Sequence, residues 1–134
     1  MKNLYFYHSI INTIAILCLS VGLFYAISKP DGWFPKHRLS MILFGIILTI
    51  SVFYALIIRE FYDETEKNYI HSTLAIVIIL LVLIQIFIAI VFRDYNRELF
   101  EKFHKINAII IVILLSFQIY FGINAYKSKT NSIL

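Results

Sequence analysis

The sequence predicts an all-α integral membrane protein, a bundle of four transmembrane helices forming one domain over residues 1–134. Three observations support this prediction: 60% of the residues are hydrophobic, only 15% are charged, and the mean hydropathy is +0.82. Soluble domains carry about 25% charged residues. The chain also contains four nearly uncharged stretches of about 20 residues, the length that crosses about 30 Å of hydrocarbon as a helix.

The four expected helices lie near 5–27, 39–59, 69–92 and 104–126. No small-x-small cleavage motif follows the apolar run of the first stretch, so we expect a retained helix and not a removed signal peptide. The four spans and their loops occupy nearly all of the residues. We therefore expect no separate soluble domain, and any soluble chemistry would come from a partner.

Charged residues gather in the loops and at the helix ends, where they indicate membrane topology rather than nucleic-acid binding. Four spans place both termini and the 60–67 loop on one side, side A, and the other two loops on side B. Side A carries five Lys or Arg residues and side B carries seven, a small excess that favours side B as the cytoplasmic-type side. Aromatic residues fall near the expected boundaries, as an aromatic belt would: Tyr5, Tyr7, Trp33, Tyr62, Tyr69, Tyr95 and Tyr126.

Four histidines stand near the starts of the four expected helices, and each opens a stripe of similar design. Steps of 4, 7, 11, 14 and 18 residues keep to one face of an α-helix. The stripes read Asn12, Ala15, Leu19, Gly22 and Ala26 after His8; Met41, Phe44, Leu48, Ser51 and Ala55 after His37; Ala75, Ile78, Val82, Gln85 and Ala89 after His71; and Ala108, Ile111, Leu115, Gln118 and Gly122 after His104. A small residue closes every stripe.

The alternating direction of the helices predicts which histidines share a level. His8 and His71 begin helices on side A, and His37 and His104 begin helices on side B. Short loops place the first helix diagonal to the third and the second diagonal to the fourth, so each pair can face across the bundle. Two facing imidazoles suit an iron held axially from both sides, which is an electron-transfer site. We therefore predict two haems, at levels at most about 27 Å apart.

Several stripe residues are candidate cofactor contacts. Gly22 and Gly122 reach the level of the opposite pair and would leave room for a macrocycle there. Gln85 and Gln118 could donate to a propionate, a ligand histidine or an ordered water, because an amide without a partner is costly in hydrocarbon. The alternatives stay open: amides such as that of Asn12 often bond between helices, small residues serve close helix packing, and single interface histidines are common boundary residues.

Charged residues near the helix ends give two further candidate sites. Arg38 and Lys105 follow the side B histidines directly, and they could pair with propionates or bind an anionic electron donor. Alternatively, they are cations whose side chains extend to the membrane surface. On side A, we expect the acidic segment Asp63, Glu64 and Glu66 to be a solvated connector; a metal site or a docking surface for a basic carrier is the alternative.

Taken together, these residues resemble the cytochrome b561 family, and most of all the four-helix cores that follow an electron-carrying DOMON domain. The similarity spans residues 5–126, with histidines separated by 29, 34 and 33 residues, similar to one ligand per core helix. The motifs that carry it are His8-x-x-x-Asn12, Trp33-Phe34-x-x-His37, His71 with Gln85, and His104 with Gln118 and Gly122.

The resemblance implies that His8 with His71, and His37 with His104, are the axial ligands of two haem b groups. It further implies an oxidoreductase that passes electrons across the membrane, from a donor such as ascorbate to monodehydroascorbate or ferric iron. The histidines would be ligands, so no catalytic acid or base is expected. The sequence departs from the family in lacking a DOMON domain and the two flanking helices, and in having Ala75 and Ala108 where a glycine is usual.

The sequence is also compatible with two other functions. The chain could be a haem-containing anchor or accessory subunit of a larger respiratory complex, with a branch to quinone. It could also be a haem-free membrane protein whose histidines bind zinc or protons. The expected partners are membrane lipid, an electron donor and acceptor, and a second copy or partner subunits, with no nucleic acid.

Overall fold

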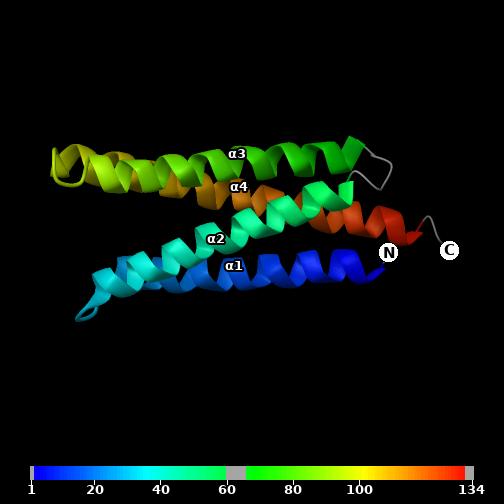
Figure 1. The fold of residues 1–134 in the computed structure, drawn as a ribbon, viewed down its shortest axis with the longest axis horizontal. Coiled ribbons are helices and arrows are strands. Elements are labelled where there is room, and N and C mark those ends of the chain that lie inside the picture. Colours follow the sequence, from blue (N-terminus) through cyan, green and yellow to red (C-terminus); the bar gives the residue numbers. More distant parts are fainter. Residues whose placement is uncertain (1, 60–65, 132–134) are drawn as a thin grey trace. The chain divides into compact units, whose positions relative to one another are not determined.

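The structure is a computed structural model that describes residues 2–59 and 66–131. Within these ranges every regular element is a helix, as Figure 1 shows: α1 (Lys2–Ser28), α2 (Trp33–Arg59), α3 (Glu66–Val91) and α4 (Arg97–Asn131). Each of these helices contains a segment long and apolar enough to cross a membrane. The chain is therefore an all-α, multi-pass integral membrane protein, as the sequence predicts.

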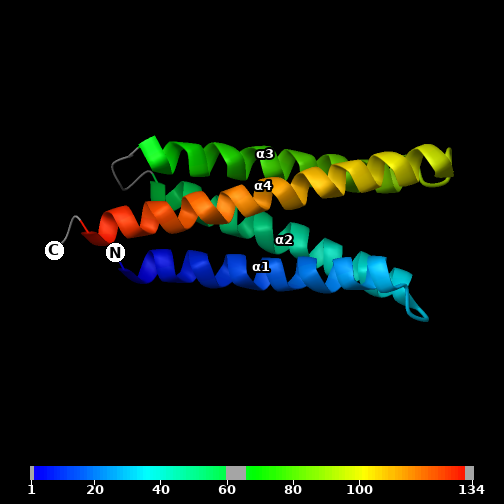
Figure 2. The same cartoon turned by 180° about the vertical axis from the view of Figure 1, so that it is seen from behind.

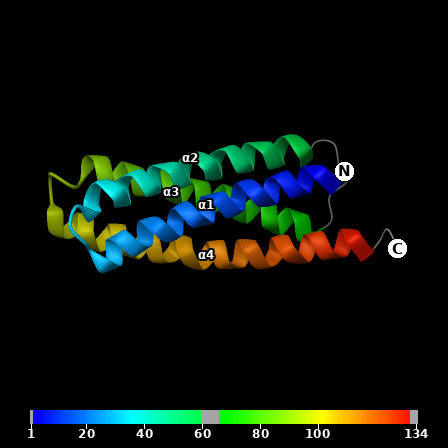
Figure 3. The ribbon, with the colours of Figure 1, turned by 90° about the horizontal axis from the view of Figure 1, so that it is seen from below.

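The helices form two compact units, each of which is an antiparallel hairpin. The first hairpin, α1 with α2, lies within Met1–Tyr62, and the second, α3 with α4, lies within Asp63–Leu134. In Figures 1 and 2, opposite views of the molecule, each helix runs beside its hairpin partner from the connecting turn onward, and Figure 3 gives a third view. Each hairpin is described below by itself, and the single domain expected over the whole chain stays a prediction.

The turn of the first hairpin explains why α2 begins at Trp33, about six residues before the expected start. Lys29 and Gly32 adopt the left-handed conformation, with φ of 45° and 65°, and reverse the chain. The Trp33 N–H donates to the Pro30 carbonyl over 2.9 Å. Pro35 lies in the first turn of α2, where backbone N–H groups have no partner within the helix, so the N–H that proline lacks is not needed there. Hydropathy does not mark this first turn, because it precedes the apolar run.

The last helix, α4, extends beyond its expected range at both ends. Asn96 caps its N-terminus, since its Oδ1 accepts the Leu99 N–H over 3.0 Å. Glu101 then lies 3.3 Å from Arg97 Nε and 3.9 Å from Lys105 Nζ, one helical turn away on either side. These charged turns begin the helix several residues before its apolar stretch. The other two helices end within three residues of their predicted bounds.

The buried face of every helix is the stripe that its histidine opens. Positions 7 and 11 after the histidine are buried in all four helices: Ala15, Leu19, Phe44, Leu48, Ile78, Val82, Ile111 and Leu115. The residue at position 14 is buried in three helices and half-buried in α4. Large apolar side chains such as Leu17, Phe53 and Phe87 lie on exposed faces, which suits contact with lipid.

Candidate functional site

Each histidine is contacted, through its Nδ1 atom, by the residue that lies fourteen positions after the other histidine of the same hairpin. The four Nδ1 distances are 3.1 Å from His8 to Ser51 Oγ, 2.8 Å from His37 to Gly22 O, 3.2 Å from His71 to Gln118 O, and 2.9 Å from His104 to Gln85 Nε2. Fourteen residues rise about 21 Å along a helix, so the two histidine levels of a hairpin are closer than the 27 Å upper bound. Both hairpins thus share one register.

His8 belongs to a closed network of three side chains. The Ser51 hydroxyl donates to Asn12 Oδ1 over 2.8 Å, so its oxygen accepts the Nδ1–H of His8. Asn12 Nδ2 then donates to His8 Nε2 over 3.0 Å. Ser51 is fully buried, at 0% exposure. With the Asn12 amide in this orientation, the His8 proton lies on Nδ1 and the lone pair on Nε2.

His37 is oriented by the backbone of α1. A carbonyl oxygen can only accept, so the bond to Gly22 O places the His37 proton on Nδ1. Gly22 also permits a close approach of the two helices, because a Cβ there would lie 2.7 Å from Met41 Sδ and 3.3 Å from Ser40 Cβ. The small residue predicted at this position thus serves helix packing in the first hairpin. The Trp33 ring lies one turn before His37, at a centroid distance of 6.0 Å.

His71 is enclosed by two residues of α4. Its Nδ1–H donates to the Gln118 carbonyl, and the Gln118 side-chain Nε2 lies 3.4 Å from His71 Nε2. A Cβ at Gly122 would lie 3.0 Å from His71 Cε1, so this glycine leaves room for the ring. Gln118 Oε1 is buried and accepts no hydrogen bond among the described residues. A bound group with an N–H or O–H could satisfy this atom, since an unpaired buried acceptor is costly.

His104 differs from the other three histidines. Gln85 Nε2 donates both to its Nδ1 over 2.9 Å and to its carbonyl over 3.0 Å. Gln85 Oε1 accepts from Asn107 Nδ2 over 2.7 Å, and that nitrogen also donates to the Leu81 carbonyl over 3.0 Å. The two carbonyls can only accept, so they fix the orientation of both amides. The His104 proton therefore lies on Nε2.

Asn107 is a site residue that the sequence analysis missed. It is 9% exposed and lies three residues after His104, between the steps of the stripe. The signal that could have identified it is an amide within an apolar span, where polar side chains are costly and usually have a function.

The two cations predicted beside the side B histidines lie at the helix surface. Arg38 is exposed, and Lys105 is exposed with its Nζ 3.9 Å from Glu101 Oε2. Their proposed contacts with an anion stay predictions. The other charged candidates, Asp63, Glu64 and the side chain of Glu66, lie outside what the structure describes.

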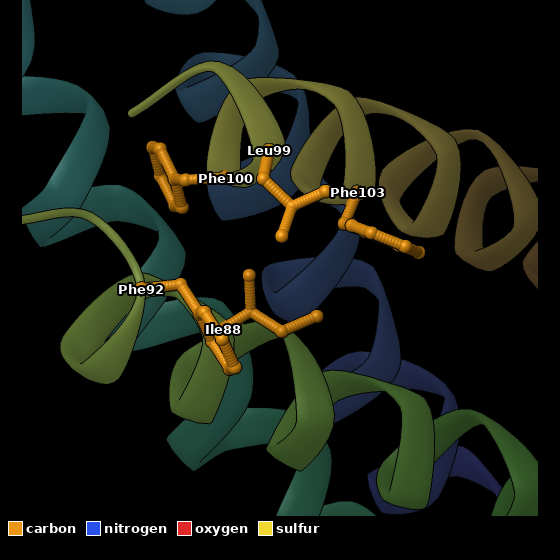
Figure 4. Close-up of a pocket in the computed structure, with 5 residues that line it drawn as sticks. All are labelled: Ile88, Phe92, Leu99, Phe100 and Phe103. Atoms are coloured by element: carbon orange, nitrogen blue, oxygen red, sulfur yellow. The ribbon is translucent and has the colours of Figure 1, made fainter. Parts of the chain in front are cut away.

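A small apolar cavity lies near the turn of the second hairpin (Figure 4). It has a volume of about 220 Å³, and residues of α3 and the turn that follows it face residues of α4 across it: Ile88, Phe92, Leu99, Phe100 and Phe103. Phe100 lies between the cavity and His104, because its ring lines the cavity and its centroid lies 5.0 Å from that of the His104 ring. The five lining side chains are all apolar, so they offer no hydrogen bond to the carbonyl groups of a quinone.

The described residues contain no group of three or more His, Cys, Asp or Glu side chains that could hold a metal ion. The haem-free alternative, in which the histidines bind zinc or protons, stays a prediction.

Comparison with known proteins gives no assignment, because no family model, curated protein or solved structure matches the chain. The cytochrome b561 resemblance stays a prediction.

Proposed function

We propose that the chain is a di-haem b-type cytochrome, similar to the cytochrome b561 family, that carries electrons across a membrane. The observation that supports it most is the fourfold repeat of the Nδ1 contacts. Each imidazole is turned inward at the end of a buried stripe, and the opposite helix holds it in the same register. Histidines that were ordinary boundary residues would need no such repeated arrangement.

In this proposal, His8 with His71 hold one haem on side A, and His37 with His104 hold the other on side B. The iron, when bound, supplies a reversible one-electron couple between its ferric and ferrous states. Metal-bound histidines typically donate their second ring N–H to a protein acceptor, which fixes the tautomer and the ring orientation. His8, His37 and His71 already have this arrangement, because each donates its Nδ1–H to an oxygen of the neighbouring helix.

The surrounding residues have supporting roles. Asn12 and Gln118 place amide nitrogens at the Nε2 atoms of the side A histidines, which satisfies these acceptors within an apolar span until a stronger ligand replaces the amides. Gly122 leaves room beside the His71 ring. Arg38 and Lys105 would pair with propionates or attract an anionic donor such as ascorbate at the side B surface.

The test is electron transfer across a sealed vesicle. The purified chain is reconstituted into lipid vesicles that contain ferricyanide, and ascorbate is added outside. We expect ferricyanide to be reduced at a rate that scales with haem content, and we expect empty vesicles and a His71→Ala variant to show only the background rate. Haem-loaded vesicles at the background rate would contradict a transporter. Recovery of the rate only after partner subunits are added would favour the accessory-subunit function.

A further inference from the structure

The four histidines do not all carry the ring proton on the same nitrogen. The contacts that determine its position are all made between the two helices of one hairpin. Three of them donate from Nδ1 to an oxygen atom: Ser51 Oγ, Gly22 O or Gln118 O. His104 instead accepts an N–H from Gln85 at Nδ1. An imidazole can bind iron through Nε2 only if that nitrogen carries a lone pair. Three of the proposed ligands therefore match the bound state, and His104 does not.

We propose that Asn107 and Gln85 hold His104 in the opposite tautomer, which makes it the weakest of the four ligands and the His37–His104 site the second to load. This inference rests on the proposed function. Ligation of iron by His104 Nε2 requires the proton to leave that atom and another proton to bind Nδ1, with no change in net charge. The new Nδ1–H would then face the Gln85 amide nitrogen, donor against donor.

The Gln85 amide cannot simply turn to relieve this conflict. Its Nε2 donates to the His104 carbonyl, and its Oε1 accepts from Asn107, which the Leu81 carbonyl holds in place. Turning the amide would break its bonds to the His104 carbonyl and to Asn107. It would also place Gln85 Oε1 against the His104 carbonyl oxygen and Gln85 Nε2 against Asn107 Nδ2. Loading at this site therefore competes with a buried network, and changes in residues around ligands commonly alter metal affinity about 10- to 100-fold.

Asn107 is the residue that sets this difference. The residues three positions after the other histidines are Ile11, Ser40 and Leu74, none of which carries an amide. Asn107→Leu gives His104 the same neighbour that His71 has and removes the donor to Gln85 Oε1. Turning the Gln85 amide then no longer opposes two N–H donors and costs only its bond to the His104 carbonyl. Gln85→Glu is the complementary change, because a carboxylate would accept the Nδ1–H of His104. Ser116→Ala is the matched control on α4, since Ser116 is exposed and its hydroxyl donates to the Val112 carbonyl one turn earlier.

The first measurement is the tautomer in the haem-free full chain. Histidine ¹⁵N shifts, recorded in detergent micelles, separate ring nitrogens that carry a proton from those with a lone pair, and loss of a signal in His104→Asn assigns His104. We expect Nε2–H at His104 and Nδ1–H at the other three, with Asn107→Leu and Gln85→Glu moving the His104 proton to Nδ1. A wild-type His104 with Nδ1–H, or an Asn107→Leu chain with an unchanged tautomer, would overturn the inference.

The second measurement is a haem titration of the same chains. We expect two phases in the wild type about 10- to 100-fold apart in affinity. The tighter phase is lost in His8→Ala, the two phases converge in Asn107→Leu and Gln85→Glu, and Ser116→Ala behaves as the wild type. Two equal sites in the wild type would overturn the inference. Absence of haem binding in every chain would instead overturn the proposed function, and the ¹⁵N result would still decide the tautomer.

Discussion

The two hairpins share one frame but use different chemistry to hold their histidines. In the first hairpin, the Nδ1 acceptors are a serine hydroxyl and a glycine carbonyl, and both rings carry the proton on Nδ1. In the second hairpin, two glutamines occupy the corresponding positions. Gln118 uses its backbone carbonyl, whereas Gln85 uses its side-chain nitrogen and reverses the tautomer of His104. The helix register of a hairpin thus determines which residue contacts each histidine, whereas the contacting atom determines which ring nitrogen carries the proton.

This comparison shows what a backbone contact and a side-chain contact can each specify. Gly22 O and Gln118 O are fixed by the helices and can only accept, so the tautomers of His37 and His71 follow from the antiparallel register alone. The side-chain amide of Gln85 can donate or accept, and its choice depends on Asn107, another side chain. The second hairpin is therefore the place where single substitutions should change ligand chemistry without changing the fold.

Removal of a proposed ligand should have the largest effect. We expect His71→Ala and His104→Ala each to lose one of two haems per chain and to leave the other partly loaded, because each variant would remove one of the two histidines that would hold the affected haem. A pyridine-haem count per polypeptide measures this. If both variants kept two haems, the ligand assignment would be wrong in both hairpins.

The two helix glycines should respond unequally to alanine. In Gly122→Ala, the new Cβ would lie 3.0 Å from His71 Cε1, so the ring must shift, and we expect haem affinity at that site to fall about 10- to 100-fold. In Gly22→Ala, the new Cβ would lie 2.7 Å from Met41 Sδ, which can move aside, and 3.3 Å from Ser40 Cβ, so the strain falls on helix packing and not on a histidine ring. Haem titration compares the two variants. Equal losses would show that close packing, not the histidine, explains both glycines.

Ser51→Ala tests the network of the first hairpin. It removes the acceptor of the His8 Nδ1–H and the donor to Asn12 Oδ1 in a fully buried position. We expect the free energy of unfolding in detergent to fall by about 1–2 kcal/mol. The control is Ser20→Ala, because Ser20 is exposed and bonds to the Ile16 carbonyl one turn earlier. An equal loss in both variants would remove the special role of Ser51.

The smallest effect is expected at the charged start of α4. Glu101 is exposed, and its contacts with Arg97 and Lys105 are surface ion pairs, which contribute little in water. Glu101→Gln should change the free energy of unfolding by less than about 0.5 kcal/mol. It should also leave the affinity of both haem phases unchanged. A large shift in the His104 phase would mean that surface charge, and not the Gln85 network, controls that site.

The sequence predicted the helices and their buried faces because hydropathy and the 3.6-residue period report both directly. It did not predict the first turns of α2 and α4, where a turn bond to Pro30 and the Asn96 cap determine the start. It placed the position 14 residues at the level of the opposite histidine, but not in contact with it. Such contacts depend on the antiparallel register of each hairpin, which a single sequence does not report.

The role of Asn107 could not be predicted from the sequence for a similar reason. An amide within an apolar span indicates that it has a hydrogen-bond partner, but the sequence does not identify that partner. Here Asn107 donates to Gln85 and to the Leu81 carbonyl on the neighbouring helix. The tautomer of His104 follows only when the whole series of bonds is known. The pairing of histidines between the two hairpins stays a prediction from topology.

The most direct test of haem binding is the dithionite-reduced minus oxidised spectrum of the purified chain, recorded with a pyridine-haem count per polypeptide. Bis-histidine ligation at both levels predicts two b-type haems per chain and a low-spin α band. A chain expressed with ample haem that nevertheless contains none would contradict the di-haem function, and its four histidines would then need another explanation.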